Sequence, residues 1–271
     1  MGSSVFCFEF TNMAPKQVQV CAFCPETANL TGEHIYADWI DRLLTHTTTH
    51  YDFTEVGPKT EQKRKYKSRH LNRKFRVVCA NCNNGWMSEI DNDARNTLKD
   101  VIKHHAPVSF LRSGLGALAA FTLKNAFVAD YIHDKPFFGT HARGQFKEHR
   151  QFPRGVYMWF GAVVTERHKR HGIYQTAYGK PSVDTPLGVQ TYVCTWSAEC
   201  LLLQLVATRW MNIMNLVSGS WPSLSQPAHL NDTFTPFWPN PGRATWPPPR
   251  YVSHNDLDAV SNRFTSINFV A

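Results

Sequence analysis

Two pairs of cysteines with the spacing CxxC constrain this chain more than any other feature of its sequence. Cys21 and Cys24 form the first pair, and Cys79 and Cys82 form the second. A CxxC pair is typical of a knuckle that points two thiolates the same way, and two knuckles complete a tetrahedron around Zn²⁺. The alternative is four unrelated buried cysteines, which the repeated spacing argues against. We therefore expect a structural zinc ion with four protein ligands.

The remaining cysteines fit a reducing compartment better than a disulfide framework. The total of seven is odd, and the N-terminus lacks a basic start followed by an apolar block. Cys7, Cys194 and Cys200 stand outside the pairs, and we expect them to be small buried hydrophobic residues. The sequence therefore favours a cytoplasmic protein.

Composition bounds the class of protein and of partner. The chain has 271 residues, 42% of them hydrophobic, which is enough for a sizeable core. No apolar run reaches the roughly 20 residues that cross a bilayer. The formal charge of +8 suggests a polyanionic partner, nucleic acid before membrane.

Patterning divides the chain into a leader at 1–20, a cysteine-bearing module at 21–105 and a second region at 106–271. In the module we expect a short helix at 37–44, a loop at 45–60 and a strand at 75–79. The clearest amphipathic helix spans 86–102, where Trp86, Ile90, Ala94, Leu98 and Val101 or Ile102 have helical spacing.

The second region changes character. Residues 115–132 predict a strongly apolar helix at the centre of the packing between the two halves. Segments rich in β-branched and aromatic residues predict strands at 156–166, 172–179 and 189–196. For 199–210, periodicity leaves strand and buried helix open. The Pro- and Trp-rich tail from Trp221 onward is expected to pack over the core in an extended form. The fold class is therefore α+β, with an N-terminal zinc-stabilised module followed by helices and antiparallel strands.

Two fragments beside the cysteines make the module more specific. GEHI, at 32–35, lies between the pairs, and Asn83 directly follows the second pair. Together with the cysteines, Glu33, His34 and Asn83 resemble the HNH, or ββα-metal, endonuclease family. The closest pattern is its zinc-braced branch, which shares its order of residues with phage Holliday-junction resolvases of the endonuclease VII type. The resemblance covers about residues 20 to 100.

The resemblance implies a role for each matching residue. A hairpin would present Glu33 and His34, and the start of a helix would present Asn83. His34 would be the general base, since a neutral histidine can take a proton from water near pH 7. Glu33 and Asn83 would hold Mg²⁺ or Mn²⁺ through oxygen atoms. The central asparagine of the family is hard to place, and Asn72 is our choice for it.

The sequence also departs from the family pattern. Glu33 replaces the commoner aspartate. Met87 stands four residues after Asn83 where a histidine would be needed, which excludes the three-histidine metal site. Alternatives stay open: the Glu33–His34 dipeptide could be solvated surface, and Asn83 could cap the helix.

A basic run lies just before the second cysteine pair. It could be a solvated loop, but its position beside the site favours a phosphate clamp with little sequence preference. Its cationic residues are Lys63, Arg64, Lys65, Lys67, Arg69, Arg73, Lys74 and Arg76.

The sequence thus favours a metal-dependent endonuclease of HNH type that hydrolyses phosphodiester bonds, with DNA preferred over RNA, in a bacterial or phage setting. The second region could choose the target, mediate homodimerisation or bind a regulator. The alternatives are a zinc-braced nucleic-acid-binding module without catalysis and a structural subunit that zinc merely stabilises.

Overall fold

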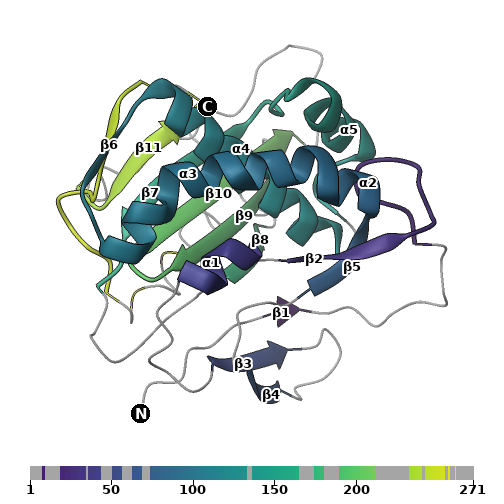
Figure 1. Cartoon of the computed structure of the whole chain (residues 1–271), viewed down its shortest axis with the longest axis horizontal. Helices are drawn as coiled ribbons and strands as arrows, with labels where there is room; N and C mark the ends of the chain where they lie inside the picture. The colour runs from purple at the N-terminus through teal and green to yellow at the C-terminus, as the bar shows by residue number, and fades with distance from the viewer. Residues whose placement is uncertain are drawn as a thin grey trace.

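The chain folds into a mixed α+β structure, as predicted, and its five-stranded sheet is antiparallel (Figure 1). In this computed structural model the described residues are 8–9, 19–34, 36–43, 51–56, 63–68, 74–132, 136–164, 174–179, 189–210, 232–239, 242–253, 256 and 260.

The cysteine-bearing part is built from a two-stranded antiparallel sheet, called the hairpin below although residues 35–73 lie between its strands in the sequence, and from a long helix. Strand β2 (Leu30–His34) pairs antiparallel with β5 (Lys74–Cys79), so that Leu30 lies opposite Cys79 and His34 opposite Lys74. Strand β5 was predicted at 75–79 and is confirmed. The chain passes from it directly into helical structure, which places the second cysteine pair at the junction of strand and helix.

The helix after β5 consists of α2 (Ala80–Cys82), a π-helical turn η1 (Asn83–Met87) and α3 (Ser88–His104). The backbone kinks at Gly85, whose φ of −92° and ψ of −118° are not helical. Helix α3 confirms the predicted amphipathic helix. Its buried residues are Ile90, Ala94, Leu98, Val101 and Ile102.

Helix α4 (Arg112–Tyr131) forms the middle layer of the molecule. Every residue from 121 to 130 is buried, which fits a helix that is apolar nearly all round. Helix α3 packs on one side of it, and strands of the main sheet pack on the other (Figure 1). The predicted apolar helix between the two halves is therefore confirmed.

The main sheet has the strand order β11 (Phe234–Trp238), β7 (Val156–Ala162), β10 (Leu201–Trp210), β9 (Val189–Ala198) and β8 (Tyr174–Gly179). Neighbouring strands are all antiparallel. The segment for which periodicity left two alternatives is strand β10. It is central and buried on both faces, so its apolar run is continuous instead of alternating.

The described part of the tail packs over the core as predicted. Strand β11 is an edge of the main sheet, and β12 (Ala244–Trp246) pairs with β6 (Val108–Phe110). Trp246 is buried and donates a hydrogen bond from Nε1 to the carbonyl of Gly161 at 3.1 Å.

Two short helices complete the frame around the cysteines. Helix α1 (Asp38–Leu43) follows β2 and confirms the short helix predicted at 37–44. Helix α5 (Thr140–His149) lies on the second half of the chain. A single hydrophobic cluster extends from Cys21 to Trp246, so the core is shared across the predicted boundary at residue 105.

The prediction of a loop at 45–60 is wrong for residues 51–56. Strand β3 (Tyr51–Val56) pairs antiparallel with β4 (Lys63–Ser68) and parallel with β1 (Phe8–Glu9). The pairing sets acidic positions of β3 opposite basic positions of β4, Asp52 with Lys67 and Glu55 with Arg64. A strand that depends on a partner for its pairing is not marked by its own residue pattern alone.

No described helix is both long enough and apolar enough to cross a membrane.

Candidate metal centre and the adjoining polar cluster

The two cysteine pairs meet at one point. The Sγ atoms of Cys21, Cys24, Cys79 and Cys82 all lie within 4.8 Å of one another. A tetrahedral zinc ion with Zn–S bonds of about 2.3 Å requires sulfurs about 3.8 Å apart. The Cys24–Cys79 distance is 3.6 Å and the Cys24–Cys82 distance is 3.8 Å. The four thiols therefore fit a zinc ion.

Backbone hydrogen bonds hold the first knuckle against the hairpin. The amide of Ala22 donates to the carbonyl of Val77 at 2.8 Å, and the amide of Ala80 donates to the carbonyl of Asn29 at 3.1 Å. The amide of Cys79 donates to the Sγ of Cys21 at 3.3 Å. The thiol positions are thus fixed by the fold on both sides of the cluster.

The thiols influence one another's pKa values. A hydrogen bond from Cys82 lowers the pKa of Cys21 to about 4 and raises the pKa of Cys82. A four-thiolate zinc centre carries a net charge of −2, and Lys147 stands beside it on the wall of a cavity of about 300 Å³. Its ammonium is ion-paired with Glu148 at 2.9 Å.

Residues of the second half of the chain contact the first cysteine pair and its neighbours. The ring of Phe23 packs edge-on against Trp86, with centroids 4.9 Å apart, and against Phe127 of α4 at 6.1 Å. Buried Arg143 of α5 donates from Nε to the carbonyl of Ala22 at 2.7 Å. Tyr131 donates its hydroxyl to the carbonyl of Val20 at 2.8 Å. The second half therefore supports the metal centre.

A buried ionic cluster lies behind the hairpin. Lys124 of α4 donates to Glu33 Oε1 of β2 at 2.9 Å and to Asp91 Oδ1 of α3 at 2.8 Å. The side chain of Lys124 is 0% exposed, that of Glu33 is 5% and that of Asp91 is 22%. Three elements that are distant in sequence thus contribute one ionic group each. We call these residues the carboxylate–lysine triad.

Charges within the triad perturb its pKa values. Burial by itself would lower the pKa of Lys124, but the carboxylates of Asp91 and Glu33 outweigh it and raise that pKa. Burial raises the pKa of Asp91, although Lys124 opposes the shift. The ammonium therefore stays charged at neutral pH.

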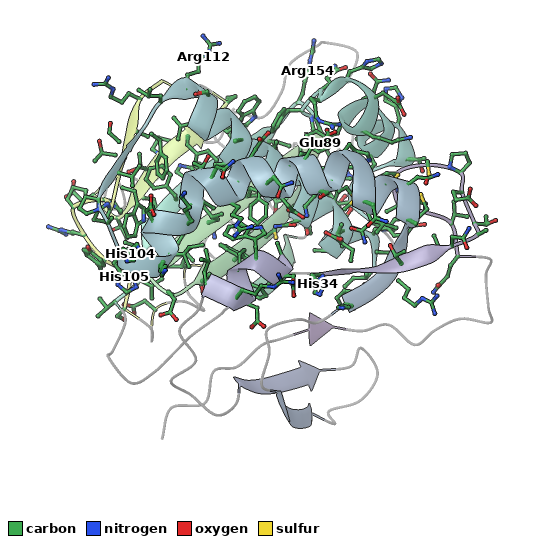
Figure 2. The ribbon with its side chains drawn as sticks, viewed as in Figure 1. His34, Glu89, His104, His105, Arg112 and Arg154 are labelled. Atoms are coloured by element: carbon green, nitrogen blue, oxygen red, sulfur yellow. The ribbon has the colours of Figure 1, made fainter. Side chains whose placement is uncertain are left out.

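His34 occupies the last position of β2, next to the triad and to α1 (Figure 2). It is half-buried, and its Nε2 atom is buried with no hydrogen-bond partner in the described part of the chain. Burial and the nearby Lys74 lower its pKa below the ordinary 6.5, while Glu33 and Asp38 oppose the shift. The imidazole is thus neutral at pH 7.

Asn83 links the helix to the hairpin. Its Nδ2 donates to the hydroxyl oxygen of Thr31 at 2.9 Å, and that hydroxyl donates to the carbonyl of Val78 at 3.2 Å. The helix begins at Ala80 and its N-cap is Cys79, so Asn83 is not the cap residue that one sequence alternative proposed.

The basic run is described only in part. Lys63, Arg64, Lys65 and Lys67 belong to β4, while Arg69, Arg73 and the chosen central residue Asn72 lie outside the described residues. Lys74 and Arg76 are exposed on β5, and Arg76 donates from its guanidinium to the carbonyl of Leu30. A phosphate clamp stays a prediction.

Sequence reasoning missed Lys124, Asp91 and Arg143. Lys124 could have been found, because a single cation inside an otherwise apolar helix must have a buried partner. Its two partners could not, since their approach depends on how α3, α4 and β2 pack. Nor does any local pattern around Arg143 indicate that it supports a zinc knuckle.

Comparison with protein-family models, with curated proteins and with solved structures finds no match for this chain. The resemblance to HNH endonucleases therefore rests on the residues themselves.

Proposed function

We propose that this chain is a zinc-braced nucleic-acid hydrolase of HNH type in which His34 is the general base. One observation carries the proposal. His34 lies at the end of a hairpin that four cysteines fix to a helix, and its imidazole is neutral and has a buried nitrogen without a partner. An unpaired nitrogen is open to a partner from outside the chain, although the described residues hold other buried polar atoms in the same state, such as Trp39 Nε1 and Trp86 Nε1.

In phosphodiester hydrolysis, His34 would carry out one step, the removal of a proton from water. The imidazole takes a proton from a water molecule as the water oxygen forms a bond to phosphorus. The bond from phosphorus to the 3′ oxygen then breaks, and that oxygen leaves with a proton from solvent. A base whose pKa is near or below 7 is deprotonated and ready at neutral pH.

The chain fits a zinc ion better than the Mg²⁺ or Mn²⁺ ion that the resemblance implies. The thiols suit zinc, which supplies rigidity when bound. For Mg²⁺ or Mn²⁺, the predicted ligands are Glu33 and Asn83. Glu33 is buried and paired with Lys124, so it offers no open carboxylate in this arrangement. The residues present therefore do not form an open site for a divalent ion at Glu33.

Substrate choice follows from charge. A net charge of +8 and the exposed Lys74 and Arg76 on the strand that pairs with His34 favour nucleic acid, with DNA as the first candidate. A bacterial or phage cytoplasm and homodimerisation through the second region stay predictions.

A second candidate is a zinc-braced module that binds nucleic acid without cleaving it. The ion pair between Lys124 and Glu33 favours it, because the carboxylate expected to hold a catalytic metal already has a cation. The two candidates share the fold and the zinc site, and they differ in whether His34 acts on substrate.

Plasmid nicking by the zinc-loaded protein tests the proposal, with Mg²⁺ or Mn²⁺ present or omitted. His34→Ala is compared with the wild type and with His104→Ala, which removes an exposed histidine at the end of α3. We expect nicking by the wild type and His104→Ala and at least about a hundredfold loss in His34→Ala. Equal nicking by all three contradicts the role of His34. DNA binding without nicking by any of them supports the second candidate.

A further inference from the structure

We propose that the ammonium group of Lys124 fills the cation position of this site, so that a residue of the protein holds Glu33 and Asp91 where a divalent metal ion would otherwise bind. Lys124 is then a positioning residue. The inference rests on the proposed function only in taking Glu33 and His34 as residues of the site.

The geometry is that of one ammonium group bridging two carboxylates. Nζ lies 2.9 Å from Glu33 Oε1 and 2.8 Å from Asp91 Oδ1, so both contacts are short charge-assisted hydrogen bonds. The oxygens come from a strand of the hairpin and from α3, and the cation comes from α4. Carboxylates from a hairpin and a helix converging on one positive charge are the arrangement expected of an oxygen-ligated metal site.

Charge explains why the ammonium is required. Buried Glu33 and partly buried Asp91 would repel each other without a cation, and both would lose hydration without full compensation. The ammonium supplies one positive charge between them. A divalent ion in the same place would be repelled by Lys124 and would need the space that Nζ occupies. Lysine and metal ion therefore exclude each other at Glu33.

Burial makes the arrangement permanent in the folded protein. Lys124 is fully buried in the middle layer, and residues 121–130 around it are buried as well. In this arrangement the Lys124 ammonium and the Glu33 carboxylate are both withheld from solvent. It follows that Glu33 ties β2, which also carries His34, to Lys124 of α4. It also follows that the wild-type protein does not recruit a divalent ion through this carboxylate.

Titration of the zinc-loaded full chain with Mn²⁺, followed by electron paramagnetic resonance, tests the inference. The proteins are the wild type, Glu33→Gln, Lys124→Met, the double variant Lys124→Met/Glu33→Gln, and Lys99→Met, which changes an exposed lysine of α3. We expect no Glu33-dependent Mn²⁺ binding in the wild type or in Lys99→Met. Lys124→Met should gain one Mn²⁺ per chain, bound at least tenfold more tightly than by the double variant.

Two results would overturn the inference. One is Mn²⁺ binding by the wild type that Glu33→Gln abolishes, which would make Glu33 a metal ligand. The other is a folded Lys124→Met protein that gains no Mn²⁺ site. If Lys124→Met does not fold or does not hold zinc, Mn²⁺ binding by the wild type and by Glu33→Gln is the deciding comparison. Since Mn²⁺ binding is read without cleavage, this inference and His34-dependent nicking can fail separately.

Discussion

Lys124 and Glu33 stand 91 residues apart in the sequence and meet at 2.9 Å in the interior of the protein. Their contact joins the apolar helix of the second half to the hairpin beside the zinc centre. Arg143 makes a second connection of the same kind, from α5 to the first knuckle. The second region, residues 106–271, therefore helps to position the candidate site.

Replacing Lys124 by methionine should lower the free energy of unfolding by about 3–5 kcal/mol, because it leaves the buried Glu33 and the partly buried Asp91 without their cation. Urea denaturation of the zinc-loaded protein measures the change. Lys99→Met, on the exposed face of α3, should stay within about 0.5 kcal/mol of the wild type. A Lys124→Met protein as stable as this control would show that the triad contributes no stability.

Zinc removal should unfold the hairpin and helix around the cysteines, because structural zinc contributes roughly 10 kcal/mol or more to such modules. We expect one zinc per chain by elemental analysis and a large fall in the melting temperature on chelation. Cys79→Ser should show both effects, whereas Cys194→Ser, a buried cysteine outside the cluster, should keep its zinc. Full zinc content in Cys79→Ser would contradict the assignment of the ligands.

Arg143→Met should loosen the first knuckle without touching a metal ligand. The variant loses the hydrogen bond to the Ala22 carbonyl and the contact with Phe138, and hydrogen bonds from charged groups are each worth about 1.5–3 kcal/mol. We expect a lower melting temperature and faster transfer of zinc to a colorimetric chelator. Arg154→Met, an exposed position, is the matched control. Zinc transfer at the same rate in both variants would separate Arg143 from the metal centre.

His34 should titrate below its ordinary pKa of 6.5 when its ring signals are followed by NMR. The groups that influence it are Lys74, Glu33, Asp38, Lys124 and Asp91. Because the folded pKa is lowered, the unfolded chain binds more protons as pH falls through 6.5. This histidine therefore makes the protein less stable below that pH, and stability returns as pH rises through the same range. His34→Gln should remove that part of the pH dependence.

A pKa of His34 at or above 6.5 would contradict the prediction, since it would mean that Glu33 and Asp38 outweigh burial and Lys74. His104, exposed at the end of α3, serves as the reference signal in the same spectra.

Much of the secondary structure could be predicted because local spacing encodes it. The amphipathic period marked α3, the apolar run marked α4, and β-branched and aromatic residues marked β7, β8 and β9. Local spacing gave the wrong prediction at β3, which pairs with a partner strand. It could not decide between strand and buried helix for β10, which is buried on both faces.

For the candidate site too, the sequence predicted one part and the tertiary structure decided the rest. Sequence alone determined the four cysteines that could hold a metal ion such as zinc, because CxxC spacing fixes how two thiolates within each pair are presented. It also singled out Glu33, His34 and Asn83 as candidate site residues. Only the tertiary structure decided their partners: Lys124 for Glu33, Thr31 for Asn83 and none among the described residues for His34 Nε2. Those contacts depend on how helices and strands distant along the chain pack together, and local spacing carries no record of that packing.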